Sequence, residues 1–345
     1  MNRIFTIIIL NLFVFSAFSQ IPNGYYDGTD NLTGNDLRTA LHNIIDGHTS
    51  KSYDNLWNYF DDTDLKSNGK IWDMYSTRAD GSSNYEYTYS TDQCGNYSAE
   101  GSCYNREHSF PKSWFNDASP MYTDLFHIYP TDGYVNGRRS NLPYGEVGGS
   151  ADWTSSNGSK KGDCTYAGYS GTVFEPIDEY KGDFARTYFY MLTRYQDLIG
   201  GWNSDMLSGD DFSTWAKNML LEWDAQDPVS QKEIDRNNAI YNIQHNRNPF
   251  IDHPEWGVVV WDPNSANVNQ INKNRFKVWY SDQAINWDFS PKSEGEIEVY
   301  NIVGQKISTI QVVTNQKHQL LDLEKGVYIA DFNLDYRRVV KFIVK

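Results

Sequence analysis

Two short segments carry residue types that can support metal-assisted hydrolysis. The first is YNREHSFP at residues 104–111, and the second, about thirty residues later, is YVNGRRSN at residues 134–141. His108 can act as a general base, and Glu107 and Asn136 offer the carboxylate and amide oxygens that Mg²⁺ prefers. We therefore expect His108 to activate water and Glu107 with Asn136 to hold a metal.

The second segment also supplies positive charge. Arg139 lies three residues after Asn136 on the same face of a helix, so a guanidinium and a metal ligand can address one phosphate. Arg138 points elsewhere and is a second candidate for substrate binding. His127 and Asn141 are candidates for supporting roles, His127 by holding the helix or the base in place.

One geometric condition applies to the first segment. Neighbouring residues on an ideal strand face opposite sides, so Glu107 and His108 can share a site only where the strand twists or ends. Pro111 favours an early end, because proline cannot donate to a ladder.

Both segments resemble the endonuclease I family of secreted, non-specific nucleases, whose sites belong to the histidine-metal finger, or ββα-metal, class. Further similar stretches are FARTYFY at residues 184–190 and the run from residue 227 to NRNPFIDHPEW at residues 246–256. The resemblance covers roughly residues 20 to 257.

The resemblance implies a divalent cation, normally Mg²⁺, with Mn²⁺ and Ca²⁺ as alternatives. It also implies attack of water on phosphorus that leaves 3′-hydroxyl and 5′-phosphate ends. His108 would then activate the water and Arg139 would hold the product phosphate. The substrate would be DNA, RNA or both, bound through the backbone without sequence specificity.

The start of the chain is typical of a signal peptide. A short basic head precedes an almost wholly apolar run of about a dozen residues, and small residues follow it at the expected cleavage position. That run is too short to cross a bilayer core of ~30 Å. We expect cleavage after Ser19, export, and no membrane span.

Composition is acidic and aromatic. The net charge is -15, with 25 Tyr and 11 Trp. An acidic surface opposes electrostatic capture of nucleic acid. Between residues 101 and 145, however, four basic and four acidic side chains balance. The tyrosines and tryptophans offer stacking surfaces for single strands.

Three cysteines allow more than one disulfide. Cys94 and Cys103 can close a short loop just before the Glu107-His108 strand, and a pairing with Cys164 is an alternative. A cysteine nucleophile is disfavoured, because no cysteine sits in a recognisable helix-start or glycine-rich setting. A zinc site is disfavoured, because no Cys-x-x-Cys pair occurs.

The spacing of apolar residues and the positions of turn-forming residues predict helices at residues 23–60 and 184–195 and a strand at 104–110. They also predict loops at 80–102 and 148–172. A helix begins after the cap at residues 131–133, and residues 230–233 form a capping box. Seven alternating strands follow residue 275, at residues 276–280, 285–289, 297–300, 307–313, 319–323, 327–332 and 339–344.

We therefore predict an α+β protein of about 325 mature residues in two domains. A signal peptide (1–19) precedes a mainly helical catalytic domain with a ββα-metal motif (20–261). A linker (262–274) then leads to an antiparallel β-sandwich (275–345). In the last, EVYNIVGQK at residues 298–306 and KGVYI at 325–329 resemble the sorting domains recognised by the type IX secretion machinery. A generic carbohydrate-binding or adhesion module is the alternative.

Two other functions fit the composition. A secreted, acidic, aromatic-rich chain can be a glycoside hydrolase with two carboxylates in an aromatic cleft, or a non-catalytic surface-binding protein. Neither explains the Glu107-His108 pair or Asn136. The sequence therefore favours a secreted nuclease that acts as a monomer.

Overall fold

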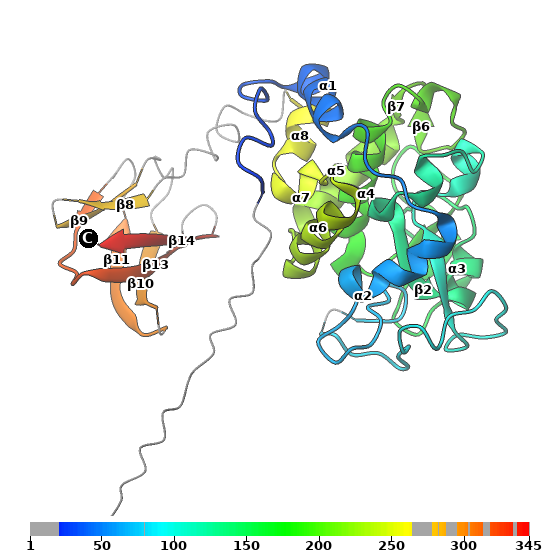
Figure 1. Ribbon diagram of the computed structural model, residues 1–345, viewed down its shortest axis with the longest axis horizontal. Coiled ribbons are helices and arrows are strands. Elements are labelled where there is room, and N and C mark those ends of the chain that lie inside the picture. Colours follow the sequence, from blue (N-terminus) through cyan, green and yellow to red (C-terminus); the bar gives the residue numbers. More distant parts are fainter. Residues whose placement is uncertain are drawn as a thin grey trace, which may run out of the picture. The chain divides into compact units, whose positions relative to one another are not determined.

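The computed structural model describes residues 21–78, 80–263, 278–281, 283–287, 295–302, 304–312, 318–333 and 337–344. The chain divides into two compact units, and the boundary falls between residues 263 and 264 of the sequence (Figure 1). The predicted signal peptide lies outside the described residues, as does the predicted linker from residue 264 onward. Within the described part of the chain, no helix is both long enough and apolar enough to cross a membrane.

The first unit is mainly helical. Helix α4 (Lys181–Arg194) is buried along its whole length and contacts α1, α5 and α7 (Figure 1). The other helices are α1 (Gly34–Ile45), α2 (Phe60–Thr63), α3 (Gly133–Arg139), α5 (Thr214–Gln226), α6 (Gln231–Gln244), α7 (Pro249–Asp252) and α8 (Trp256–Trp261). Six 3-10 turns complete the described helical elements: η1 (Tyr53–Tyr59), η2 (Lys112–Phe115), η3 (Met121–Thr123), η4 (Leu125–His127), η5 (Asp178–Tyr180) and η6 (Ile199–Gly201).

Two strands and a helix carry the segments singled out by the sequence. Strand β1 (Tyr104–His108) pairs antiparallel with β2 (Ile128–Asp132), and α3 begins directly after β2. The Asp132 side chain caps α3 by accepting the backbone N–H of Val135 at 2.8 Å. From α6, Arg236 Nη2 donates to the Ile128 carbonyl at 2.7 Å, which fixes β2 to the helical core.

Some sequence predictions were confirmed and others were wrong in extent. The capping box at the start of α6 is formed by Ser230 and Glu233. The predicted single helix at residues 23–60 is instead broken, because α1 ends at Ile45 and Gly47 has a φ of 75°. The predicted loop at residues 148–172 contains β3 (Trp153–Thr154) and β4 (Lys160–Asp163), which pair with β5 (Thr172–Glu175) in one sheet. Strands β6 (Leu207–Ser208) and β7 (Asp211–Phe212) form a small hairpin.

The second unit consists of strands. One antiparallel sheet has the order β11-β10-β13-β14 and another has the order β12-β9-β8. Their bounds are β8 (Val278–Ser281), β9 (Ala284–Trp287), β10 (Gly295–Asn301), β11 (Lys306–Val312), β12 (His318–Leu320), β13 (Gly326–Asn333) and β14 (Arg337–Val344). Each of the seven predicted strands overlaps one of these.

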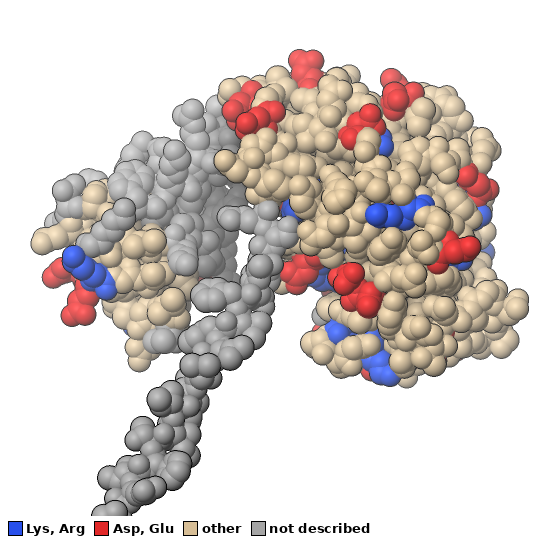
Figure 2. Space-filling view, viewed as in Figure 1, with Lys and Arg blue, Asp and Glu red and all other residues tan. Residues whose placement is uncertain are grey.

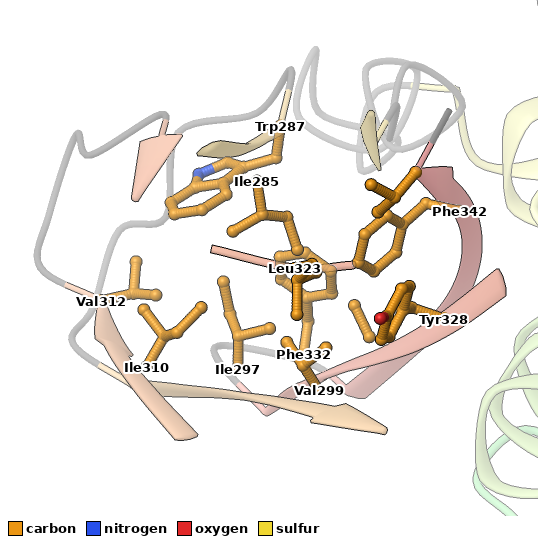
Figure 3. Close-up of a cluster of buried hydrophobic side chains, with 12 residues drawn as sticks. Ile285, Trp287, Ile297, Val299, Ile310, Val312, Leu323, Tyr328, Phe332 and Phe342 are labelled. Carbon is orange, nitrogen blue, oxygen red and sulfur yellow. The ribbon is translucent and has the colours of Figure 1, made fainter. Parts of the chain in front are cut away.

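The two sheets of the second unit share one apolar cluster. Ile285 and Trp287 from β9 pack with Ile297, Phe332 and Phe342 from the larger sheet (Figure 3). Because alternate residues of a strand point to the same side, β9, β10, β11, β13 and β14 send alternate side chains into this cluster. The chain as a whole is an α+β protein with small antiparallel sheets, as expected.

Candidate active site

Glu107 lies in the interior, near the end of β1. Its side chain is 2 % exposed. Its Oε1 accepts a hydrogen bond from the hydroxyl of Tyr75 at 2.9 Å and lies 3.1 Å from Arg139 Nη1. Burial raises the pKa of Glu107, and the charge of Arg139 and the Tyr75 hydroxyl oppose this rise. Two neighbours therefore fix one oxygen of the carboxylate.

Arg139 is buried as deeply as its partner. It is 1 % exposed, donates from Nη1 to the His108 carbonyl at 3.0 Å, and also donates from Nη2 to the Ser109 carbonyl. Its guanidinium lies 4.7 Å from the ring centre of Tyr144. Although burial lowers it, the neighbouring Glu107 raises the pKa of Arg139. Nη1 and Nη2 of Arg139 therefore hold Glu107 and the end of β1, and its Nε is buried without a hydrogen-bond partner among the described residues. This burial argues against the predicted contact of Arg139 with a substrate phosphate.

His108 points to the other side of the strand. Its Nε2 lies 3.1 Å from the carbonyl of Tyr122, and its ring stacks on the Tyr122 ring at 5.3 Å. A carbonyl only accepts, so Nε2 carries the hydrogen and Nδ1 carries the lone pair. Nδ1 has no hydrogen-bond partner among the described residues. Burial, followed by the nearby His127, lowers the pKa of His108 to about 3, so the ring is neutral at pH 7.

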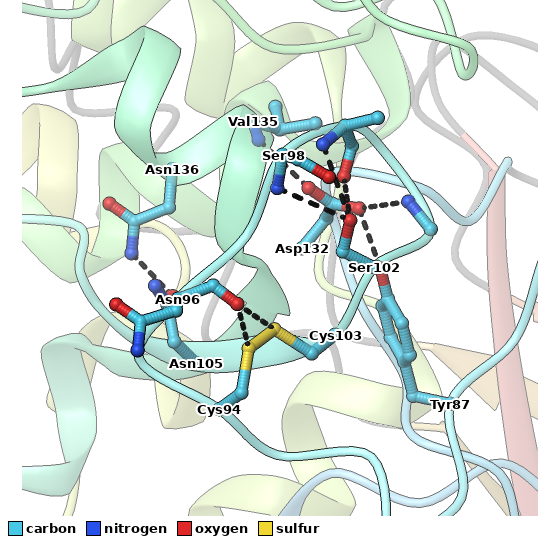
Figure 4. The surroundings of a disulfide bond; sticks show 12 residues. Tyr87, Cys94, Asn96, Ser98, Ser102, Cys103, Asn105, Asp132, Val135 and Asn136 are labelled. Carbon is cyan, nitrogen blue, oxygen red and sulfur yellow. Dashed lines mark hydrogen bonds between the residues drawn. A yellow bond between two sulfur atoms is a disulfide. The ribbon is translucent and has the colours of Figure 1, made fainter.

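Asn136 lies on α3 beside the start of β1. Its amide Nδ2 donates to Oδ1 of Asn105 at 2.7 Å (Figure 4). Next to this contact a disulfide joins Cys94 to Cys103, with their Cα atoms 5.8 Å apart. Cys164, the third cysteine, is buried and free. The bridge lies directly before β1, the place where the sequence suggested a brace.

The donor atoms that remain suit a hard cation. Oε2 of Glu107 and Oδ1 of Asn136 accept no hydrogen bond from the described residues, whereas the other polar atom of each side chain is held. Carboxylate and amide oxygens are the ligands that Mg²⁺ takes, with water completing its shell. Among the described residues, no three His, Cys, Asp or Glu side chains gather as a metal-binding group.

The other predicted residues are placed around this centre. Arg138 is exposed, and its guanidinium lies 5.0 Å from the ring of Tyr134. His127 is fully buried, and its Nε2 lies 2.7 Å from the Met121 carbonyl. Asn141 is exposed and lines a polar cavity of about 410 Å³.

Sequence reasoning missed the tyrosines that shape the site. Tyr75 holds Glu107, and Tyr122 holds and stacks on His108. Tyr53 stacks on Tyr122, with ring centres 4.6 Å apart, and its ring centre lies 6.0 Å from that of His108. None of the three lies in a motif, and only the tertiary fold brings them to β1. A tyrosine-rich composition was the one signal available.

Charge is distributed rather than concentrated on the visible surface. On the face of the first unit drawn in Figure 2, Lys and Arg side chains occur at separate places between Asp and Glu side chains. The whole chain carries a net charge of -15. On this face, attraction of a polyanion would therefore depend on individual cations.

Each of the two units matches a known protein family. The model of the family described as Endonuclease I matches residues 33–255, and that of the secretion system C-terminal sorting domain matches residues 281–345. An extracellular ribonuclease of Bacillus subtilis is 35% identical over 246 residues, which is 69% of this chain and 78% of that protein. An endonuclease-1 of Buchnera aphidicola is 30% identical over 37% of this chain and 44% of its own length. An extracellular deoxyribonuclease of Aeromonas hydrophila is 28% identical over 38% of this chain and 50% of its own length.

Proposed function

The chain belongs to the endonuclease I family, and from this premise we propose that it hydrolyses phosphodiester bonds within DNA, RNA or both by a metal-dependent mechanism. It is a nuclease that is secreted or held at the cell surface, and its second unit is a secretion sorting domain. The relatives include proteins named for ribonuclease and for deoxyribonuclease activity, so both nucleic acids are included in the proposal.

One observation carries the mechanism. His108 is neutral, its Nε2 is held by a backbone carbonyl, and its Nδ1 is left as a lone-pair donor. Such a ring can take a proton from water without rotating, which is what a general base requires.

Glu107 and Asn136 would hold the cation through the two oxygens that have no hydrogen bond. We expect Mg²⁺, with Mn²⁺ or Ca²⁺ as alternatives; when bound it would stabilise the charge that develops on the phosphate and the leaving oxygen. His108 Nδ1 would accept the proton of the attacking water. The products would carry 5′-phosphate ends.

The remaining site residues take supporting roles in this scheme. Arg139 positions Glu107 instead of contacting substrate, since its guanidinium is buried. Arg138 is exposed and remains a proposed backbone contact. His127 packs beside His108 and helps to hold its ring in place, with their ring centres 5.4 Å apart. Asn141, just after α3, is proposed as a support of the same region.

The same proposal assigns the architecture. Strands β1 and β2 with α3 would form the ββα-metal motif, and the two sheets of the second unit would form a sandwich. The catalytic domain would run from residue 20 to 261, the linker from 262 to 274, and the sorting domain from 275 to 345, delivered by the type IX secretion machinery. The apolar cluster shared by the two sheets supports the sandwich assignment. The enzyme would act as a monomer.

Membership in a nuclease family disfavours the two rival functions, a glycoside hydrolase and a non-catalytic binding protein. A glycoside hydrolase would also need a pair of carboxylates at its centre. At this centre Glu107 is instead paired with an arginine.

A comparison of three variants tests the proposal. His108→Ala should lose 10² to 10⁴ in cleavage rate yet still bind Mn²⁺, because a base and not a ligand has gone. Glu107→Ala should lose activity and metal together, and Asn136→Ala should weaken metal binding less, because it removes a neutral ligand. The measurements are calorimetric titration of Mn²⁺ and cleavage of supercoiled plasmid and of RNA.

Two results would contradict the proposal. The wild-type enzyme should lose cleavage of both substrates in EDTA and regain it with excess Mg²⁺, so full activity in chelator would exclude a metal mechanism. If His108→Ala fails to bind Mn²⁺ while Glu107→Ala binds normally, the base and the ligand have been exchanged.

A further inference from the structure

Arg106 shares a face of β1 with His108. The two residues are two positions apart on the strand, and alternate residues point to the same side. Glu107 and its buried partner Arg139 lie on the opposite side. Arg106 is therefore the arginine of β1 that accompanies the proposed base.

Two aromatic rings contact the guanidinium of Arg106. Its central carbon lies 3.6 Å from the ring centre of Tyr53 and 4.4 Å from that of Trp57. Both rings belong to η1, and all three side chains are half-buried. Cation–π contact of this kind orders an arginine but leaves the in-plane edge of the guanidinium free for hydrogen bonding.

Only part of that edge is used. Nη1 donates to the carbonyl of Tyr53 at 2.6 Å, and Arg106 forms no ion pair among the described residues. A guanidinium donates five N–H bonds, so donors remain for a ligand. By contrast, the neighbouring Lys112 is paired with Asp117 at 2.6 Å.

Tyr53 connects Arg106 to His108. Its ring contacts the guanidinium of Arg106, and its ring centre lies 4.6 Å from that of Tyr122 and 6.0 Å from that of His108. Tyr122 in turn stacks on His108 at 5.3 Å. The positive charge of Arg106 also contributes to lowering the pKa of His108, as expected from their proximity.

We propose that Arg106 binds a backbone phosphate of the substrate strand beside the bond that His108 would attack. This proposal rests on the proposed nuclease function and adds a phosphate contact to it. The ordered fork suits the two oxygens of a phosphodiester, and guanidinium is the group that binds phosphate bidentately. Arg106 thus takes the role expected from the sequence for Arg139.

Binding without cleavage tests this directly. Anisotropy of a labelled twelve-nucleotide single strand, as DNA and as RNA, is measured in EDTA over a range of NaCl concentrations with the full mature chain. Arg106→Gln should raise Kd several-fold for both strands, and the slope of log K against log salt should become shallower by about 0.7, the value for one phosphate contact on a single strand. Lys217→Gln, on α5, removes a half-buried charge from a helix that packs on α4 and α8, and should leave the slope unchanged.

A second variant separates charge from geometry. Arg106→Lys keeps the charge but not the fork, so the slope should stay while Kd rises. Circular dichroism shows whether Arg106→Gln folds. If it does not fold, Arg106→Lys is the deciding variant, and an unchanged Kd for Arg106→Lys overturns the proposal.

If Arg106→Gln folds and its Kd and salt slope are unchanged, the proposal is also overturned, even if turnover falls. Arg106 would then act only by ordering the neighbouring aromatic rings. Since no metal or cleavage is involved, failure of the proposed catalytic mechanism would leave this result intact.

Discussion

At the scale of single residues, the Glu107–Arg139 pair determines how the proposed metal ligand is presented. Both side chains are almost completely buried, at 2 % and 1 % exposure. Arg139 also bonds to the carbonyls of His108 and Ser109, so the same guanidinium holds the ligand and the strand that carries the base. One substitution should therefore disturb both roles at once.

Arg139→Ala should lower the free energy of unfolding by about 3 to 5 kcal/mol, because it leaves a buried carboxylate without its charge partner. Arg138→Ala, on the exposed neighbour, should change it by less than about 0.5 kcal/mol. Urea unfolding of both variants, followed by tryptophan fluorescence, provides the measurement. If Arg139→Ala is stable and its affinity for nucleic acid depends less steeply on salt concentration, Arg139 contacts the substrate after all.

Tyr75→Phe tests how Glu107 is held. The Tyr75 hydroxyl donates to Glu107 Oε1 and lies 2.8 Å from the hydroxyl of Tyr144. Removing a hydrogen bond to a metal ligand typically costs 10 to 100-fold in metal affinity or activity, and we expect a loss in that range for Mn²⁺ binding. Tyr166→Phe removes a comparable hydroxyl that bonds to Glu222, and should be neutral. Equal affinities for Mn²⁺ in the two variants would show that the Tyr75 hydroxyl does not position a metal ligand.

The sequence could predict residue types but not how deeply each would be buried. His108, Glu107 and Asn136 were found from chemistry and spacing alone. The burial of Arg139 could not be found, since it depends on Tyr75, which is remote in sequence, and on other tyrosines that meet only in the folded state. Helical spacing correctly places Asn136 and Arg139 on α3 but does not reveal which of them faces solvent.

At the scale of elements, the disulfide stabilises the entrance to β1. Cys103 directly precedes the strand, and its carbonyl accepts the N–H of Gly133 at the start of α3 at 2.9 Å. The backbone N–H of Cys94 donates to the carbonyl of Tyr104 at 3.0 Å. The bridge thus links a loop to the junction of the strand and the helix that carry Glu107 and Asn136.

Replacing both cysteines, as Cys94→Ser with Cys103→Ser, should cost about 2 to 3 kcal/mol for a loop of this short length. Dithiothreitol should lower the melting temperature of the wild-type protein and leave that of the double variant unchanged. Cys164→Ala should keep the response to dithiothreitol, because that thiol is not bridged. A melting temperature of the wild type that does not respond to dithiothreitol would mean that the bridge does not stabilise the fold.

Elements with strong local signals were predicted well, and those defined by distant partners were not. The alternating strands of the second unit and the capping box of α6 follow from period and side-chain chemistry. Strands β3 and β4 were assigned to a loop, because their Gly- and Ser-rich segment gains regular structure only by pairing, β4 with β5 at residues 160–163. A strand of two residues, such as β3, carries no period to detect.

At the scale of the whole molecule, the two units have separate cores. The second unit is built on its own cluster around Ile285, Trp287 and Phe332. The first ends in α8, where Trp261 stacks on Phe189 of α4 at 4.6 Å and donates from its indole nitrogen to Asp211. The match to the family model ends at residue 255, whereas the core of the first unit also includes buried residues of α8.

A chain shortened to residues 20–263 should fold and cleave nucleic acid in vitro at close to the full-length rate, but should not reach the cell surface or medium, because the sorting domain has gone. A chain ending at residue 255 should fail to fold, since it removes Trp256, Val259 and Trp261 from the core, and burying each large apolar side chain contributes about 1.5 to 3 kcal/mol. Cleavage rates and urea unfolding of both purified chains, with immunoblots of cells and medium for the first, make the comparison. An inactive or insoluble chain of residues 20–263 would show that the second unit is needed by the catalytic one.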